Sequence, residues 1–506
     1  MTSKIAEVHE LGQVPATELL RPVVPKSDAE RTQSRLKQDL KTSPIFFFGI
    51  VVVSTWEAYS NTAVISLFNG GPRSTIIGVF VAGVGAWCIV RSLASMAKKE
   101  PYIGAQYRWT KMYCPQGLNP LFWSHLQGWF TTWAWIVSAS VLPYYTASQI
   151  LGVVTLFYPT YVMGGWHIYL VAVAFMIIPI LANLYARGAL KWIELVGGGC
   201  HLLAYIVITA VLWTAAPTNT NDFVFRQHSD VPTGWTNEAV RTLLGMQATL
   251  LPLTAFDGTL HMSGEVKNPR ERVPRAMTWS YGIGWIFLIT FMFTFNFHIG
   301  DPAVIAAAPP GWQLILIIQQ ATKHAGATAF IMVLFMLTSL GAYFNGVASV
   351  SRLVWAFSRD RGLPLSRFLT QINPRFEVPL RAILLVAGST LILLLLPVFS
   401  ATAWNALLSL STIALYVSYF MPIFFACLHR RKTGWSDIEL GITEVVAVVW
   451  SLFVIGLLCV PPVLPANTPS SVPWSGPIMG MVGVVALIDW TVRGHREYTP
   501  VESHEE

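Results

Sequence analysis

Long apolar stretches dominate this sequence of 506 residues. A helix that crosses the hydrocarbon core of a bilayer needs about 20 mostly apolar residues, and stretches of this kind recur along the chain. Charged residues make up only 12% of the sequence, too few to cover the surface of a soluble protein of this size. The sequence therefore predicts an all-α polytopic membrane protein. The twelve predicted spans lie near 44–67, 74–97, 121–154, 167–185, 192–216, 243–262, 277–299, 327–350, 379–397, 403–428, 438–460 and 476–492.

Basic residues are distributed unevenly between the loops. Twelve spans place both termini on one side of the membrane, and 28 of the 33 lysines and arginines fall on that side. Because cytoplasmic loops carry an excess of Lys and Arg, we expect both termini to be cytoplasmic. The location that we expect is the plasma membrane, which the charges do not distinguish from an organelle membrane. The same distribution accounts for the net charge of +7 and leaves no basic stripe for nucleic acid. The opposite side receives Arg73, Arg226, Arg241 and Lys323, and Arg91 lies within the second span.

The segments outside the spans are short. Residues 1–43 lack the apolar core of a signal peptide and predict a disordered cytoplasmic N-terminal tail, and residues 493–506 predict a cytoplasmic C-terminal tail. Residues 44–492 between them predict the membrane domain. The five cysteines show neither metal-ligand nor disulfide spacing, and the chain has no P-loop motif. We therefore expect no metal, no cofactor and no enzymatic activity, and we expect any function to lie within the membrane.

The first span is interrupted by polar residues. Apolar residues 46–53 are followed by the polar segment Ser54–Thr62, after which apolar residues resume. Glu57 lies about 12 residues into the span, or roughly 18 Å, which is close to the middle of a bilayer. Irregular backbone is tolerated at this depth only where protein or a watery cavity satisfies its polar groups. The interruption therefore predicts a broken helix beside a cavity.

The sixth span carries a second interruption. Pro252 removes a helical hydrogen bond, Gly258 adds backbone flexibility, and Asp257 places a carboxylate inside the span. The two interrupted spans are five apart, so a five-span repeat would begin its second copy from the opposite membrane face. A small ligand is expected between the two breaks. The predicted inverted repeats are about 44–216 and 243–428, followed by extra helices at 438–492.

Each titratable residue near the breaks also has a structural interpretation. In the structural interpretation, Glu57 pairs with Arg91 or with a cluster of hydroxyls, and Asp257 caps the second half of the sixth helix. His261 follows Asp257 by four residues and would share its helix face, either as a satisfied polar residue or as a proton carrier. The sequence leaves these alternatives open.

Three segments carry recognisable motifs. Gly104–Tyr107, which reads GAQY, follows the second span. Ser351–Pro364, which reads SRLVWAFSRDRGLP, follows the eighth span. The third segment, Thr254–Met277, covers the end of the sixth span and the loop after it. Its motifs are Phe256-Asp257, His261-Met262-Ser263, Glu265, Asn268-Pro269 and Pro274-Arg275-Ala276.

In their order and spacing these motifs resemble the amino acid–polyamine–organocation superfamily, and in particular its amino acid/choline transporter branch, which is common in fungi. The likeness extends from about residue 39 to residue 492. Two positions depart from the pattern: Gly264 stands where the first of two Glu is frequent, and Arg361 stands where Gly is frequent. The resemblance implies a LeuT-like core of five plus five helices and secondary active transport by alternating access.

The breaks and the resemblance together predict a permease for an amino acid or a related small amine. The two carboxylates at the breaks favour a cationic substrate. Glu57 and Asp257 are also candidates for proton coupling. The alternatives are a choline or quaternary amine transporter, a transporter of an alkaloid-like pathway metabolite, and a nutrient sensor that transports nothing. The predicted substrate-binding residues are Ser54, Thr55, Trp56, Glu57, Thr254, Ala255, Phe256, Asp257, Gly258, Tyr343 and Asn345.

Overall fold

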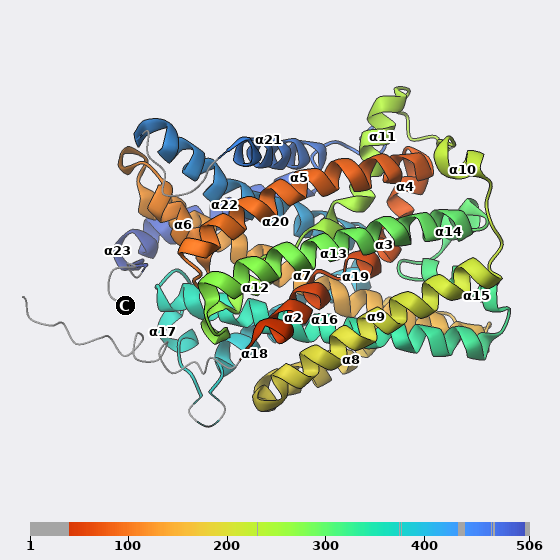
Figure 1. The fold of residues 1–506 in the computed structure, drawn as a ribbon, viewed down its shortest axis with the longest axis horizontal. Helices are drawn as coiled ribbons and strands as arrows, with labels where there is room; N and C mark the ends of the chain where they lie inside the picture. Colours follow the sequence, from red (N-terminus) through yellow and green to blue (C-terminus); the bar gives the residue numbers. More distant parts are fainter. Residues whose placement is uncertain are drawn as a thin grey trace, which may run out of the picture. The chain divides into compact units, whose positions relative to one another are not determined.

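The computed structural model is shown in Figure 1. Its regular elements, within the part of the chain that it describes, are all helices, apart from one isolated β-bridge between Leu40 and Val266. Most of the predicted N-terminal tail and the last six residues of the predicted C-terminal tail lie outside this part. The described residues are 40–229, 231–373, 375, 377–433, 441–466, 468 and 471–500.

Nine helical segments of the described residues are long and apolar enough to cross a membrane. Each coincides with a predicted span, which confirms a multi-pass membrane protein. Seven are single helices: α5 (Gly71–Lys99), α7 (Pro120–Phe157), α8 (Gly165–Tyr185), α9 (Leu190–Ala215), α13 (Pro269–His298), α16 (Ala325–Arg359) and α20 (Ala401–Thr433). The other two are composed of α18 (Leu380–Leu393) with α19 (Leu396–Phe399), and of α22 (Ser475–Asp489) with the π-helix η6 (Trp490–Gly494) and α23 (His495–Glu497).

The first, sixth and eleventh predicted spans are built from shorter helices, so the count of twelve spans stays a prediction. The eleventh is α21 (Ile442–Leu457). The first consists of α2 (Thr42–Val53), α3 (Thr55–Thr62) and α4 (Val64–Phe68). The sixth consists of α11 (Glu238–Met246), the 3-10 turns η3 (Gln247–Thr249) and η4 (Leu251–Leu253), and α12 (Gly258–His261).

Short helices occupy the connections and gather at the two ends of the long ones. Figure 1 shows α6, α17 and α23 at one end, and α10, α11, α14 and α15 at the other. The first end carries the loops that we expect to be cytoplasmic. The connecting helices are α6 (Ala105–Tyr113), η1 (Gln116–Leu118), η2 (Arg187–Ala189), α10 (Asn221–Phe225), η5 (Ser263–Glu265), α14 (Pro302–Ala307), α15 (Gln313–Thr322) and α17 (Ser366–Leu369).

The close packing of α5 against α13 depends on a glycine. The Tyr281 hydroxyl donates to the Gly83 carbonyl at 2.8 Å, and Trp285 Nε1 donates to the Val79 carbonyl at 2.9 Å. A Cβ atom on Gly83 would lie 2.0 Å from the indole ring of Trp285. The indole can therefore reach the α5 backbone only because Gly83 has no side chain.

We predict that Gly83→Ala destabilises the protein by about 1–3 kcal/mol, because the added methyl group overpacks the contact with Trp285. Thermal unfolding of the purified chain measures the effect. The matched control is Gly197→Ala in α9, where a Cβ atom would meet nothing within 4 Å. Alanine is the better helix former, so the control is expected to keep or raise the unfolding midpoint. Equal midpoints for the two variants would contradict the packing argument.

Candidate functional site

The first span breaks at Ser54. This residue has φ 44° and ψ 51°, in the left-handed region, and it separates α2 from α3. The Ser54 amide still donates to the Ile50 carbonyl, and the Thr55 hydroxyl donates across to the Gly284 carbonyl on α13 at 2.7 Å. The break is thus anchored to a neighbouring helix, and α3 starts a new helix N-terminus inside the bundle.

The sixth span breaks at the matching place. The 3-10 turn η4 ends at Leu253, Thr254 is extended, and Ala255 has φ 64°. The Ala255 amide donates to the hydroxyl of Tyr419 on α20 at 3.0 Å, which satisfies a backbone group that no helix serves. Both breaks occur where the sequence predicts irregular backbone, and each has a non-glycine residue at positive φ.

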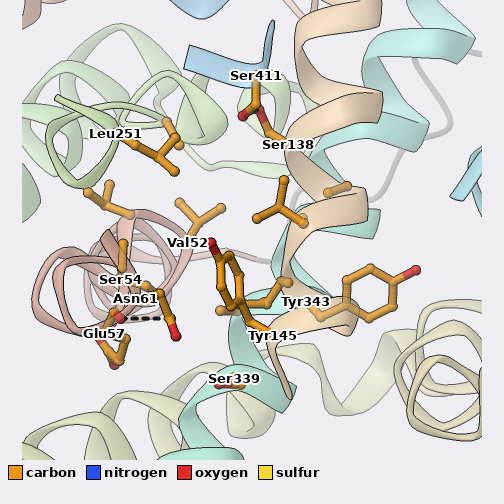
Figure 2. Close-up of a pocket in the computed structure, with 18 of the residues that line it drawn as sticks. Val52, Ser54, Glu57, Asn61, Ser138, Tyr145, Leu251, Ser339, Tyr343 and Ser411 are labelled. Carbon is orange, nitrogen blue, oxygen red and sulfur yellow. Dashed lines mark hydrogen bonds between the residues drawn. The ribbon is translucent and has the colours of Figure 1, made fainter. Parts of the chain in front are cut away.

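A cavity of about 130 Å³ lies beside both breaks. Five elements line it: the α2–α3 junction, α7, the break in the sixth span, α16 and α20. Figure 2 shows Ser54, Glu57 and Asn61 together on one side, with the Tyr145 side chain near them. The polar lining is connected, because Asn61 Nδ2 donates to the Glu57 carbonyl and Gln149 Nε2 donates to Asn61 Oδ1, both at 3.1 Å.

The predicted substrate-binding residues divide into two groups. The residues that line the cavity are Ser54, Glu57, Thr254, Ala255 and Tyr343. The residues that pack behind its wall are Thr55, Trp56, Phe256, Asp257, Gly258 and Asn345. Other polar or aromatic residues of the wall include Trp135, Asn61, Gln149 and Ser411. A binding role stays a prediction for both groups.

Trp56 does not face the cavity but lies in an aromatic cluster. Its side chain is fully buried, and its ring lies 5.1 Å from that of Phe291 and 5.5 Å from that of Phe335. Phe256 is likewise covered, because it stacks on Tyr419 with ring centroids 4.8 Å apart. The two aromatic residues next to the breaks therefore hold the breaks in place rather than wall the cavity in this conformation.

Glu57 pairs with His201 of α9, a partner that the sequence analysis did not identify. His201 Nδ1 lies 2.6 Å from Glu57 Oε1, and Trp56 Nε1 donates to His201 Nε2 at 3.2 Å. An indole nitrogen can only donate, so Nε2 carries the lone pair and Nδ1 carries the proton. In this arrangement His201 is therefore neutral, and its Nδ1 lies against the carboxylate of Glu57. Among the described residues, no lysine or arginine forms an ion pair with Glu57.

Asp257 is the most completely hydrogen-bonded acid near the breaks. Its Oδ2 accepts from Gln106 Nε2 at 2.7 Å and from Trp135 Nε1 at 2.9 Å, and its Oδ1 accepts from the Tyr419 hydroxyl at 2.7 Å. The side chain is fully buried and precedes α12 without making a capping hydrogen bond. Asp257 therefore joins the break to α6, α7 and α20 instead of capping the helix.

His261 lies one turn beyond Asp257, as the spacing predicts. Its Nε2 is 3.6 Å from Asp257 Oδ2, which is longer than a hydrogen bond, and its ring meets Trp135 edge-on at 5.3 Å. The histidine is fully buried. The structure therefore places a titratable group beside the carboxylate without forming a direct bond between them.

A third buried acid, Glu194 of α9, was also missed from the sequence. Its Oε2 accepts from Asn345 Nδ2 of α16 at 3.0 Å, and the same amide lies 3.4 Å from the Phe48 carbonyl of α2. Glu194 and His201 are seven residues apart in an apolar span and share a helix face. Ionisable residues inside a span are themselves a signal of function, and this signal could have identified both.

The two motif segments meet at the end of the bundle that carries α6. Arg352 Nε lies 3.0 Å from Glu265 Oε1, and both side chains are buried. Leu40 pairs with the same loop, because its amide donates to the Glu265 carbonyl and its carbonyl accepts from Lys267, both at 3.0 Å. The loop that follows the broken sixth span is thus fastened to α16 and to the start of the first span.

Asp360 forms a second junction at this end. The Tyr107 hydroxyl donates to its Oδ2 at 2.8 Å, Arg108 Nη2 lies 3.3 Å from the same oxygen, and the Thr499 amide donates to its carbonyl at 3.1 Å. Burial, and then the charge of Asp360, raise the pKa of the Tyr107 hydroxyl above its ordinary value, so Tyr107 remains a donor. Arg361 adopts φ 56°, which explains why glycine is favoured at this position of the motif.

Comparison with known proteins identifies the same region of the chain. The model of the amino acid permease family matches residues 40–484. The choline transporter of Saccharomyces cerevisiae is 25% identical over 476 residues, which cover 93% of this chain and 84% of the relative. Amino-acid permease 2 of Neurospora crassa is 25% identical over 480 residues, which cover 92% and 87%. The GABA-specific permease of Saccharomyces cerevisiae is 26% identical over 414 residues, which cover 79% and 70%.

We predict that Tyr419→Phe lowers the stability of the protein by about 1–3 kcal/mol, because it leaves the Ala255 amide without an acceptor and removes a donor from Asp257. Thermal unfolding checks this. The control is Tyr144→Phe, because the Tyr144 ring packs against Trp404 at 4.2 Å and its hydroxyl bonds to nothing among the described residues. A loss no greater than that of the control would show that the Tyr419 hydroxyl does not hold the break.

Proposed function

This chain belongs to the amino acid permease family, a family of transporters and not of enzymes, and on that premise we propose that it carries a small amine-bearing metabolite across the membrane by alternating access. The observation that carries the proposal is the cavity beside both helix breaks, with a buried carboxylate, Glu57, in its wall. An amino acid or a related amine is the substrate class that this wall suits best.

The charge of the cavity wall supports recognition of an amine. His201 is neutral, so the negative charge of Glu57 has no cation of the described residues to offset it. An ammonium group that enters the cavity would supply the missing positive charge. The carboxylate of an amino acid would lie at the start of α3, where the first backbone amides lack helical partners and the helix dipole is positive.

Coupling to protons is the driving force that we propose. Asp257 accepts hydrogen bonds from Gln106, Trp135 and Tyr419, and the Trp135 indole can only donate. A proton on Asp257 would remove its charge and weaken these hydrogen bonds, including the one from Tyr419, which also holds the Ala255 amide. Protonation at this position would loosen the sixth span from α20. Glu57 is the second candidate, because it lines the cavity itself.

The proposed architecture is a LeuT-like core of two inverted five-span repeats with two extra helices. It is supported by the two breaks, each of which places a residue at positive φ near the cavity, Ser54 in the first span and Ala255 in the sixth. Counting the first, sixth and eleventh segments as spans brings the nine long helical segments to twelve. The distribution of basic residues supports cytoplasmic termini, and the plasma membrane is the location that we propose.

Choline or another quaternary amine is the second candidate substrate. A permanent cation binds best to aromatic faces combined with an anion, and the cavity wall contains Trp135, Tyr145 and Tyr343 as well as Glu57. The choline transporter among the relatives supports this candidate. Uptake measured in a transport-deficient cell, with amino acids, polyamines and choline as competitors at two external pH values, separates the candidates. No uptake of any of them would favour a sensor or a carrier of a pathway metabolite.

We predict that Glu57→Gln weakens the uptake of cationic substrates at least about tenfold more than that of neutral ones, because a charge-assisted hydrogen bond becomes a neutral one. Competition uptake with one cationic and one neutral substrate measures the difference. Glu444→Gln is the control, because Glu444 is also buried but its carboxylate caps α21 away from the cavity. An equal loss for both substrates would assign Glu57 a structural role.

We predict that Asp257→Asn abolishes uptake or its dependence on external pH while the protein still reaches the cell surface. The asparagine oxygen can still accept from Gln106 and Trp135, but its nitrogen cannot accept from the Tyr419 hydroxyl. The variant therefore resembles the protonated acid and cannot titrate. Surface labelling and uptake at two pH values give the two readouts. Normal uptake with normal pH dependence would remove Asp257 from the coupling mechanism.

A further inference from the structure

A groove rich in basic residues lies away from the transport cavity, at the junction of α5 and α13. It has a volume of about 640 Å³ and is lined by the last turns of α5, by Glu100 and by the first turns of α13. The two helices are fastened together next to it by the hydrogen bond from Tyr281 to Gly83. The basic residues of the groove are Arg91, Lys98, Lys99, Arg270 and Arg275.

The positive charge of this groove is largely uncompensated. Arg275 forms an ion pair with Glu271 at 2.8 Å, one turn earlier on α13. Arg91, Lys98, Lys99 and Arg270 form no ion pair with any of the described residues. Five cations thus face one lining acid, Glu100. A ligand with several negative charges would find complementary charge here.

The depth of Arg91 indicates that the ligand comes from the membrane. Arg91 precedes Lys98 by seven residues, so it lies two helical turns, about 10 Å, further into the span on the same face of α5. Its side chain is exposed on a helix long and apolar enough to cross the membrane. A cation at the edge of the hydrocarbon is costly unless its guanidinium reaches an anion at the level of the headgroups.

An apolar surface continues from the groove along both helices. Trp279 lines the groove and is 64% exposed, as expected of tryptophan at a membrane interface. Ile286, seven residues further along α13, is 58% exposed, and Val84, seven residues before Arg91 on α5, is 53% exposed. The exposed side chains thus change from basic to apolar in the order in which a phospholipid changes from headgroup to acyl chain.

We propose that this groove binds the phosphorylated headgroup of an anionic phospholipid, with the acyl chains against the exposed apolar faces of α5 and α13. Arginine and lysine side chains pair strongly with phosphate oxygens, and guanidinium groups do so with two parallel hydrogen bonds. Basic pockets between membrane helices on the cytoplasmic side suit such headgroups. The site is separate from the transport cavity, so the proposal does not depend on the proposed substrate.

The test compares two triple variants of the full-length chain. The groove variant is Arg91→Gln, Lys98→Gln, Arg270→Gln, and the control variant is Lys191→Gln, Lys267→Gln, Arg367→Gln, which removes the same charge from exposed positions outside the groove. Native mass spectrometry counts the phosphatidylinositol phosphate molecules retained by the purified protein against a phosphatidylcholine background. We expect the groove variant to bind this lipid at least about tenfold more weakly than the wild type, and the control to bind it within about twofold of the wild type.

Three further measurements separate loss of the lipid site from misfolding and separate the headgroup from the acyl chains. Thermal unfolding shows whether the groove variant is folded, and Arg91→Lys with Arg270→Lys, which keeps the charge, is expected to retain binding. Equal lipid binding by the groove and control variants would overturn the proposal. So would equal affinity for the water-soluble inositol phosphate headgroup and for the intact lipid, because the apolar faces would then contribute nothing.

Discussion

The core of a bilayer offers no water to a backbone that leaves its helix, and the site depends on how this chain meets that constraint. At the first break the new helix is tied to α13 through Thr55, and at the second the Tyr419 hydroxyl accepts from the Ala255 amide. Asp257 accepts from the same hydroxyl and holds α6 and α7 as well. The irregular backbone is therefore stable at membrane depth because side chains from distant helices replace the solvent.

Two acids near the breaks have opposite environments, and the difference separates their chemistry. Asp257 is enclosed by three donors and fixes the geometry of the sixth span. Glu57 lines the cavity and has a neutral histidine as its partner, whose tautomer is set by Trp56. The Asp257 carboxylate is thus engaged by side chains of three neighbouring helices, while the Glu57 carboxylate faces the cavity.

The sequence predicts the breaks well because their causes are local. Pro252 and the polar run from Ser54 disrupt a helix wherever they occur in an apolar span, and the structure breaks at these places. The orientation of side chains is not local. Trp56 turns into an aromatic cluster and Asn345 turns to Glu194, because packing between helices far apart in sequence decides which face is covered. For the same reason the sequence did not identify His201 or Tyr419, which act only through partners on other spans.

The β-bridge between Leu40 and Val266 joins the residue just before α2 to the loop that follows α12. That loop follows the broken sixth span directly and is held to α16 by Glu265 and Arg352. In the proposed transport cycle, a movement of this loop would break the two backbone hydrogen bonds that hold Leu40.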